Sequence, residues 1–413
     1  MRFLHTADVH LDSSLSSRSA AVRGRLRDAS RLAFQRLADL ALAERVDAVV
    51  IAGDLFDDER LSFQTERFIL EQLARLNEVG IPVVYATGNH DPGREGLRSS
   101  DLSWPSNVTV ARDREVKRVI VEDANGGSVG VVSAVGHATS SERDDLSGVF
   151  PPPEGHLPEV AVLHTQVMDS PGSLKHGEYA PSNLDRLRDS GHDYWALGHV
   201  HKRLTLSEQP AIHYPGNLQG RTHGERGPKG CLLVEVRLGS PPRVEFKELA
   251  PIRWEDLEVR DPTDASTLDQ LVRTVAERWE DVTGGTSGLS WIGRVRISGA
   301  TPLWRELSRE DDQDHLRDEL AHRLGVLELA VEIGSVYSLA RVEDHLSRED
   351  VLGQALRLVR GVRSGEITLS DLGCEHLIGV EDPDGLDSYV RELLDTGEEE
   401  VLARMLKSVV ENR

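Results

Sequence analysis

Five short polar blocks, each following an apolar run, most constrain the fold of this chain. They are Asp8-Val9-His10, Gly53-Asp54, Gly88-Asn89-His90-Asp91, His164 and Gly198-His199-Val200-His201. The runs at 46–52, 81–87, 160–163 and 194–197 read as buried strands, and helical periodicity lies between the early ones. This alternation predicts a layered α/β fold in which the polar blocks meet where the strands end.

Turn-forming residues between other apolar runs predict antiparallel strand pairs. Asn125-Gly126-Gly127 separates two apolar runs between 116 and 134, and the turn at 239–242 separates the runs at 231–236 and 243–246. Both patterns are typical of β-hairpins. We therefore expect either one mixed sheet or two sheets packed as a β-sandwich, flanked by helices.

Three regions are expected along the chain. Residues 1–250 carry the polar blocks and form the main domain. Residues 251–340 show a strand-helix-strand-helix-strand order, which is typical of a small α+β domain, and we expect it to cap the first. Residues 341–413 read as a helical tail, with cap-like spacing of Ser347 with Asp350 and of Thr396 with Glu399, and a linker at 381–387.

The polar blocks contain enough ligands for two metal ions. They comprise two carboxylates, one carboxamide and four imidazoles, from Asp8, Asp54, Asn89, His10, His164, His199 and His201. Asp54 can bridge two ions. Nitrogen and oxygen ligands without thiolate suit Mn²⁺, Zn²⁺ or Fe²⁺ better than Ca²⁺. Two such ions held side by side are suited to phosphoester hydrolysis.

The third block also contains a candidate acid–base residue. His90 directly follows the candidate ligand Asn89 and precedes Asp91. We expect His90 to donate a proton or a hydrogen bond to the reacting phosphate or to the leaving oxygen. Asp91 is expected to orient this imidazole and to raise its pKa by favouring the charged form.

The ordered blocks resemble the motifs of the calcineurin-like metallophosphoesterase superfamily. The first twelve residues are similar to the start of SbcD-type DNA repair exonucleases. The stretch from Tyr214 to Arg221, followed by Gly227 to Cys231, is similar to the segment after the last metal histidines in YhaO-like members. The resemblance covers about residues 1–250, and beyond them only the arrangement of a small capping domain and a helical tail agrees.

The resemblance implies a division of the ligands and a set of partners. One ion would be held by Asp8, His10 and His201, and the other by Asn89, His164 and His199, with Asp54 bridging and His90 as the catalytic histidine. The implied fold is a metallophosphoesterase-type layered β-sandwich. Mn²⁺ is the expected metal, with Zn²⁺ or Fe²⁺ as alternatives. The implied partners are DNA, a second copy of the chain, and an SMC-like coiled-coil ATPase bound by the C-terminal helices.

Basic residues soon after the last metal histidines are candidates for contact with DNA phosphates. They are Lys202, Arg203, Arg221, Arg226 and Lys229, with His223 as a further group that can approach the scissile phosphate. An ordinary scatter of surface charge is the competing interpretation. The net charge of −22 lies mostly beyond residue 250, because residues 1–250 sum to −6 and residues 251–413 to −16. Two bound divalent ions would therefore make the cleft of the first domain positive.

The rest of the composition leads us to expect a cytoplasmic protein without membrane contact. No apolar run is long enough to span a bilayer, and the first residues lack the apolar core of a signal peptide. Cys231 and Cys374 are far apart and form neither a zinc-binding nor a disulfide pattern. This cysteine usage fits a reducing compartment.

A metal-dependent DNA exonuclease serving repair, with endonuclease activity as an extension, is the leading functional hypothesis. A phosphodiesterase or phosphatase acting on a small nucleotide is the alternative. The expected capping domain and tail favour the nuclease, because a small-molecule enzyme needs neither. A non-catalytic DNA-end-binding scaffold subunit is a third hypothesis, and the presence of His90 argues against it.

Overall fold

The computed structural model describes residues 1–57, 61–93, 102–168, 179–284, 288–338, 342–368 and 371–373, and part of the stretch from 389 to 405. The chain divides into two compact units, Met1–Trp254 with Gly288–Ser290, and Glu255–Ser287 with Trp291–Arg413. The first unit contains all five polar blocks. Among the described residues, no helix is both long enough and apolar enough to cross a membrane.

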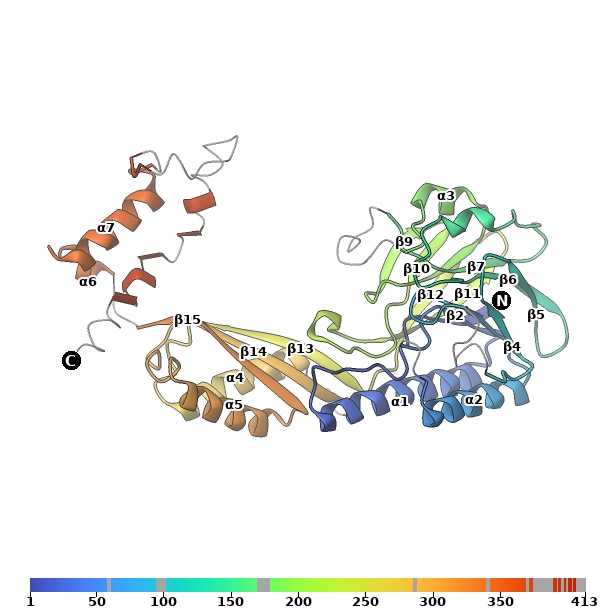
Figure 1. Cartoon of the computed structure of the whole chain (residues 1–413), viewed down its shortest axis with the longest axis horizontal. Helices are drawn as coiled ribbons and strands as arrows, with labels where there is room; N and C mark the ends of the chain where they lie inside the picture. Colours follow the sequence, from blue (N-terminus) through green and yellow to red (C-terminus); the bar gives the residue numbers. More distant parts are fainter. Residues whose placement is uncertain are drawn as a thin grey trace. The chain divides into compact units, whose positions relative to one another are not determined.

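Two six-stranded sheets build the described part of the first unit (Figure 1). The first contains, in spatial order, β12 (Ser240–Glu248), β11 (Gly230–Arg237), β1 (Arg2–Thr6), β2 (Ala48–Ala52), β3 (Val83–Ala86) and β4 (Val108–Ala111). The second contains β5 (Lys117–Glu122), β6 (Ser128–Val135), β7 (Glu159–His164), β8 (Tyr194–Gly198), β10 (Ala211–Tyr214) and β9 (Leu204–Glu208). Strands β1 to β4 are parallel, as are β6, β7, β8 and β10, so their carboxyl ends lie at one edge of each sheet.

Alternate residues along the central strands face different layers. In β2, Ala48, Val50 and Ala52 belong to the core between the two sheets, whereas Val49 and Ile51 belong to the core beneath the helices. Every residue of β2 is buried, as expected for a strand that is covered on both faces. The unbroken apolar run in the sequence therefore reflects a strand inside a sandwich.

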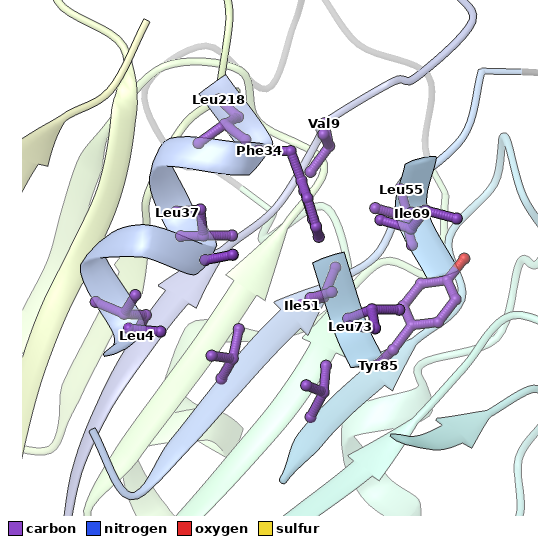
Figure 2. Close-up of a cluster of buried hydrophobic side chains, with 14 of the residues drawn as sticks. Leu4, Val9, Phe34, Leu37, Ile51, Leu55, Ile69, Leu73, Tyr85 and Leu218 are labelled. Carbon is purple, nitrogen blue, oxygen red and sulfur yellow. The ribbon is translucent and has the colours of Figure 1, made fainter. Parts of the chain in front are cut away.

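Two long helices, α1 (Ala20–Glu44) and α2 (Phe63–Glu78), cover the outer face of the first sheet. Figure 2 shows Phe34 of α1, Leu73 of α2 and Ile51 of β2 in the same buried cluster. The outer face of the second sheet packs against α3 (Leu184–Asp189) and the 3₁₀ helix η1 (Leu146–Val149). The first unit is thus a β-sandwich with helices on both outer faces, and the predicted layered fold is confirmed.

The two predicted hairpins are present in this sandwich. β5 and β6 pair antiparallel around the Asn125-Gly126-Gly127 turn, and β11 and β12 pair antiparallel. The second turn is shorter than expected, because β12 begins at Ser240 and includes Pro241 and Pro242. β12 is an edge strand, and the two prolines lie where its register with β11 shifts, between the pairs Glu235–Arg243 and Arg237–Ser240. Edges and bulges are the places in a sheet where proline is tolerated.

The second unit has the predicted β-α-β-α-β order. Its elements are β13 (Ile252–Arg260), α4 (Leu268–Thr283), β14 (Ser290–Ala300), α5 (Glu310–Leu324) and β15 (Glu328–Tyr337), and the three strands form one sheet with α4 beside α5 (Figure 1). α5 begins at Glu310, where three acidic residues in the first turn suit the positive end of the helix dipole.

The tail begins with α6 (Glu343–Leu346) and α7 (Val351–Ser364), and the described residues between 389 and 405 are also mostly helical. Asp350 caps α7 by accepting a hydrogen bond from the backbone N of Gly353 at 3.1 Å. The expected pairing of Ser347 with Asp350 is not formed, because Ser347 ends α6 and Asp350 is itself the N-cap. The Thr396 and Glu399 pattern and the linker expected at 381–387 lie outside the described residues.

Candidate metal centre

The five polar blocks follow strands whose carboxyl ends meet where the two sheets approach each other. The backbone N of Asp8 donates to the carbonyl of Gly53 at 3.1 Å, which joins the first two blocks. Gly198, at the end of β8, lies against Ala52 of the other sheet, and a Cβ there would be 1.7 Å from the Ala52 carbonyl oxygen. Glycine is therefore required at this position by the close approach of two strands.

Four of the predicted ligands have an unusual backbone conformation. The φ angles of Asp8, His10, Asp54 and His199 are 51°, 49°, 51° and 103°. Positive φ is uncommon for residues other than glycine, and such strain concentrates at binding and catalytic sites. These strained turns direct the four side chains toward one another.

Asp8, His10 and His201 form one group of candidate ligands. The Nε2 atoms of His10 and His201 are 3.2 Å apart, and His201 Nε2 is 3.7 Å from Asp8 Oδ1. Asp8 is held in place by the backbone N of His199, which donates to its carboxylate at 3.0 Å. These separations suit atoms that surround one ion, because ligands at ~2.1 Å from a metal lie roughly 3–3.5 Å from each other.

Asn89, His164 and His199 form the second group. Asn89 Oδ1 lies 3.0 Å from His164 Nε2 and 3.2 Å from His199 Nδ1. Both imidazoles therefore converge on the carboxamide oxygen of Asn89. A neutral oxygen and two imidazole nitrogens are ligands that Mn²⁺, Zn²⁺ and Fe²⁺ accept.

Asp54 lies between the two groups. Its Oδ2 atom is 3.4 Å from His164 Nε2 and 3.6 Å from His10 Nε2, so one oxygen faces both groups. Its Oδ1 atom accepts a hydrogen bond from the backbone N of His90 at 2.9 Å, which fixes the carboxylate plane. The position of Asp54 is that of a bridging ligand, and the candidate clusters indicate a dinuclear site for divalent metal ions.

The outer nitrogens of three imidazoles are engaged by acceptors outside the ligand groups. His10 Nδ1 donates to Asp57 Oδ1 at 3.0 Å, His201 Nδ1 to Glu225 Oε1 at 2.7 Å, and His164 Nδ1 to the Ala52 carbonyl at 2.9 Å. Such bonds set the tautomer and turn the Nε2 lone pairs inward toward a metal. Asp57 and Glu225 were missed by the sequence reasoning, because neither has a spacing that links it to a distant histidine.

The charge states within the cluster also fit a bound cation. Burial lowers the pKa of His10 to about 3, so its imidazole is neutral and available as a ligand. Burial also disfavours the charged form of His164, but the Asp54 carboxylate outweighs this effect and raises the pKa of His164 to about 9. The carboxylates thus stabilise a positive charge between them, and divalent ions would supply that charge.

His90 lies at the edge of the cluster with 44% of its side chain exposed. Its Nδ1 atom is 3.1 Å from Asp57 Oδ1, and its ring packs edge-to-face on His10 with 4.8 Å between ring centroids. The hydrogen bond to Asp57 raises the pKa of His90 despite its partial burial. The expected orienting carboxylate and the raised pKa are both present, but the carboxylate is Asp57.

The role predicted for Asp91 is therefore wrong. Its carboxylate is only 2% exposed and accepts hydrogen bonds from the backbone N atoms of Asp54, Leu55, Phe56 and Gly88. The Tyr85 hydroxyl, drawn in Figure 2, also donates to it. In the turn after β3, the side chains of His90 and Asp91 point in different directions. Asp91 therefore links the loop that carries Asp54 to the loop that carries Asn89, and it does not orient the His90 imidazole.

Replacing Asp91 with alanine is expected to destabilise the metal-free protein by about 3–5 kcal/mol, because the buried backbone donors lose their shared acceptor. Urea unfolding followed by circular dichroism measures this loss. Asp189→Ala, an exposed change at the end of α3, is the matched control and should alter stability by less than about 0.5 kcal/mol. An equally small loss in Asp91→Ala would contradict the assigned role.

The predicted phosphate contacts occupy different environments. Lys202 and Arg226 are exposed, the Arg203 guanidinium lies 3.9 Å above the Phe246 ring, and His223 packs edge-to-face on Trp254. Lys229 does not fit the prediction, because it is buried and its Nζ donates to the carbonyl of His201 at 2.7 Å. Arg221 also points inward, toward Asp57 and Glu225, and is treated below.

Comparison with known proteins agrees with this site. Residues 1–203 match the family model described as calcineurin-like phosphoesterase, and residues 254–336 match the middle domain of metallophosphoesterase YhaO. The uncharacterized metallophosphoesterase YhaO of Bacillus subtilis is 32% identical over 74% of this chain and 73% of its own length. The DNA double-strand break repair protein Mre11 of Methanopyrus kandleri is 27% identical over 93% of this chain and 87% of its own length.

A third relative, the SbcD subunit of the nuclease SbcCD from Bacillus subtilis, is 29% identical over 36% of this chain and 37% of its own length. The similarity to YhaO spans most of both proteins, and the two family models match both units of the structure. The chain therefore belongs to the calcineurin-like metallophosphoesterases that carry a YhaO domain, a family of metal-dependent phosphoesterases.

Proposed function

We propose that this protein is a metal-dependent DNA exonuclease, with endonuclease activity as an extension. The observation that carries the proposal is the pair of ligand groups sharing Asp54, with the half-exposed His90 beside them. Such a constellation serves phosphodiester hydrolysis. The choice of DNA is supported by relatives named as a DNA repair protein and as a nuclease subunit.

The residues divide the chemistry between them. When bound, two divalent ions supply an activated water and neutralise charge on the phosphate. Asp57 accepts a hydrogen bond from the Nδ1–H of His90, which leaves the Nε2–H of the imidazolium free to donate to the leaving oxygen. Asp91 keeps the loops that carry Asp54 and Asn89 in register, and Asp54 in turn positions the backbone of His90.

A cleft of about 620 Å³ opens beside His90. It is lined by Asp12, Ser14, Arg27, Leu61 and Ser62 together with Asp57 and His90. The cleft allows a substrate to reach the candidate catalytic histidine from the side of α1. This access is compatible with a polymer chain whose scissile phosphate lies at the ligand groups.

Metal identity and partners belong to the same proposal. Mn²⁺ is the proposed metal, and Lys202 and Arg226 remain proposed phosphate contacts. Residues 251–340 are proposed to cap the nuclease domain, and residues 341–413 to bind an SMC-like coiled-coil ATPase beside a homodimer of this chain. Deletion of residues 341–413 should abolish co-purification with that ATPase, and retention of the partner would refute the binding role.

One assay tests the proposed activity. Purified protein with Mn²⁺ is offered end-labelled single- and double-stranded linear DNA, closed circular DNA and the small diester bis-p-nitrophenyl phosphate. We expect mononucleotide release from linear DNA. Cleavage of the small diester alone would favour an enzyme for small nucleotides. Binding of DNA ends without any cleavage would favour the scaffold role.

A further inference from the structure

Arg221 lies between the two carboxylates that orient the histidines. Its NH1 atom is 3.5 Å from Asp57 Oδ1 and donates to Ser13 Oγ at 3.2 Å, and its NH2 atom is 3.5 Å from Glu225 Oε1. Ser13 Oγ donates in turn to Asp57. The Arg221 side chain is only 14% exposed, so its guanidinium belongs to the wall of the site and not to the outer surface.

The two carboxylates beside Arg221 serve three imidazoles. Asp57 accepts hydrogen bonds from the Nδ1 atoms of His10 and His90, and Glu225 accepts one from Nδ1 of His201. Glu225 is fixed further by the backbone N of Arg221 at 2.6 Å. The guanidinium thus closes a continuous chain of contacts that joins His90 to both imidazoles of the Asp8, His10 and His201 group.

We propose that Arg221 is a positioning residue that fixes the first ligand group and His90 and does not contact substrate phosphate. The side chains of Asp57 and Glu225 are 14% and 11% exposed. Without a cation on the side away from the metal site, both carboxylates would rotate toward a bound divalent ion. The planar guanidinium lies 3.5 Å from both carboxylates at once, and its charge keeps their oxygens available as acceptors for the imidazole N–H groups. The proposal rests on the metal-binding role assigned to the site.

The second ligand group has a different support. The outer nitrogen of His164 is held by the Ala52 carbonyl, and Asn89 converges with His164 and His199 without either carboxylate. Loss of Arg221 should therefore weaken one of two metal sites. This asymmetry separates a positioning role from a general loss of structure, which would weaken both sites.

The test is Mn²⁺ binding to metal-free protein by isothermal titration calorimetry, beside turnover of bis-p-nitrophenyl phosphate. For Arg221→Ala we expect one of two sites to weaken by about 10–100-fold and the other to change by less than about 2-fold. Arg221→Lys should not restore the lost affinity, because an ammonium group cannot bridge both carboxylates. Arg237→Ala, an exposed change on β11, is the matched control.

Two results would overturn the proposal. An unchanged isotherm with a raised KM for DNA and normal turnover of the small diester would show that Arg221 contacts substrate. Equal weakening of both sites would show that it supports the fold generally. Glu225→Gln should reproduce the one-site loss if Arg221→Ala fails to fold. Absence of DNA cleavage by the wild type would refute the proposed substrate but leave the binding comparison valid.

Discussion

Replacing Asp54 with alanine is expected to remove two-metal binding and to lower kcat/KM for any phosphodiester by on the order of 10³-fold or more. Asp54 Oδ2 is the atom that faces both ligand groups, at 3.4 Å from His164 Nε2 and 3.6 Å from His10 Nε2. Charge stabilisation by bound ions contributes several kcal/mol to such reactions, and each 1.4 kcal/mol is about a tenfold change in rate.

Metal content after gel filtration and turnover of bis-p-nitrophenyl phosphate measure this effect. Circular dichroism establishes that the variant is folded. Asp318→Ala is the matched control, because its carboxylate is 76% exposed on α5. Retention of two ions per chain in Asp54→Ala would show that the carboxylate does not bridge them.

His90→Ala is expected to lower the rate of DNA cleavage by about 10²–10⁴-fold while both ions stay bound. His90 contacts Asp57 and packs on the ring of His10. Of the cluster formed by His10, Asp57 and His90, it is the exposed member. Loss of a proton donor matters most where the leaving oxygen is a poor leaving group, as in DNA. The rate is therefore expected to fall less with bis-p-nitrophenyl phosphate than with DNA, because nitrophenolate leaves without being protonated.

Comparison of the two substrates tests the assigned role directly. An equal loss with both would show that His90 acts on the phosphate and not on the leaving oxygen. Loss of metal content in His90→Ala would show that it is a ligand. An unchanged rate with DNA would refute any catalytic role.

The pH dependence follows from the same hydrogen bond. Asp57 raises the pKa of His90 above its ordinary value of 6.5, so the imidazole stays protonated to higher pH. Proton donation is then fully present below the raised pKa and is lost as pH rises through it. Asp57→Asn should move the basic limb of the rate profile with DNA to lower pH. A basic limb that does not move would show that another group produces it.

The layered fold and the candidate ligand set were both predicted from local patterns. Runs such as Val49 to Ala52 suit a strand that is buried on both faces, and this is where the run lies in the structure, with its polar block directly after the strand. Parallel strands place those ends together. The side chains of Asp8, Asp54 and His164 therefore meet as the sequence predicts.

The groups that tune the ligands did not follow from local patterns. Asp91 is adjacent to His90 in sequence, but the turn after β3 sends it to the backbone of the Asp54 loop. Asp57, distant from His10 and His90 in sequence, takes the role that was assigned to Asp91. The charge of Lys229 predicts a surface side chain, but the residue is buried and donates to the His201 carbonyl.

The sequence by itself determined the layered α/β fold, the candidate ligand set and the candidate catalytic histidine, because strand periodicity and the residues at strand ends are local properties. The choice of a sandwich and the division of the ligands into two groups came from the family resemblance. Only the tertiary structure decided which carboxylate orients which imidazole, and whether Arg221 faces substrate or the wall of the site. Those contacts join different loops of the chain: His10 and Asp57 are 47 residues apart, and His201 and Glu225 are 24 apart. Their geometry depends on how the loops pack, which no spacing of residues records.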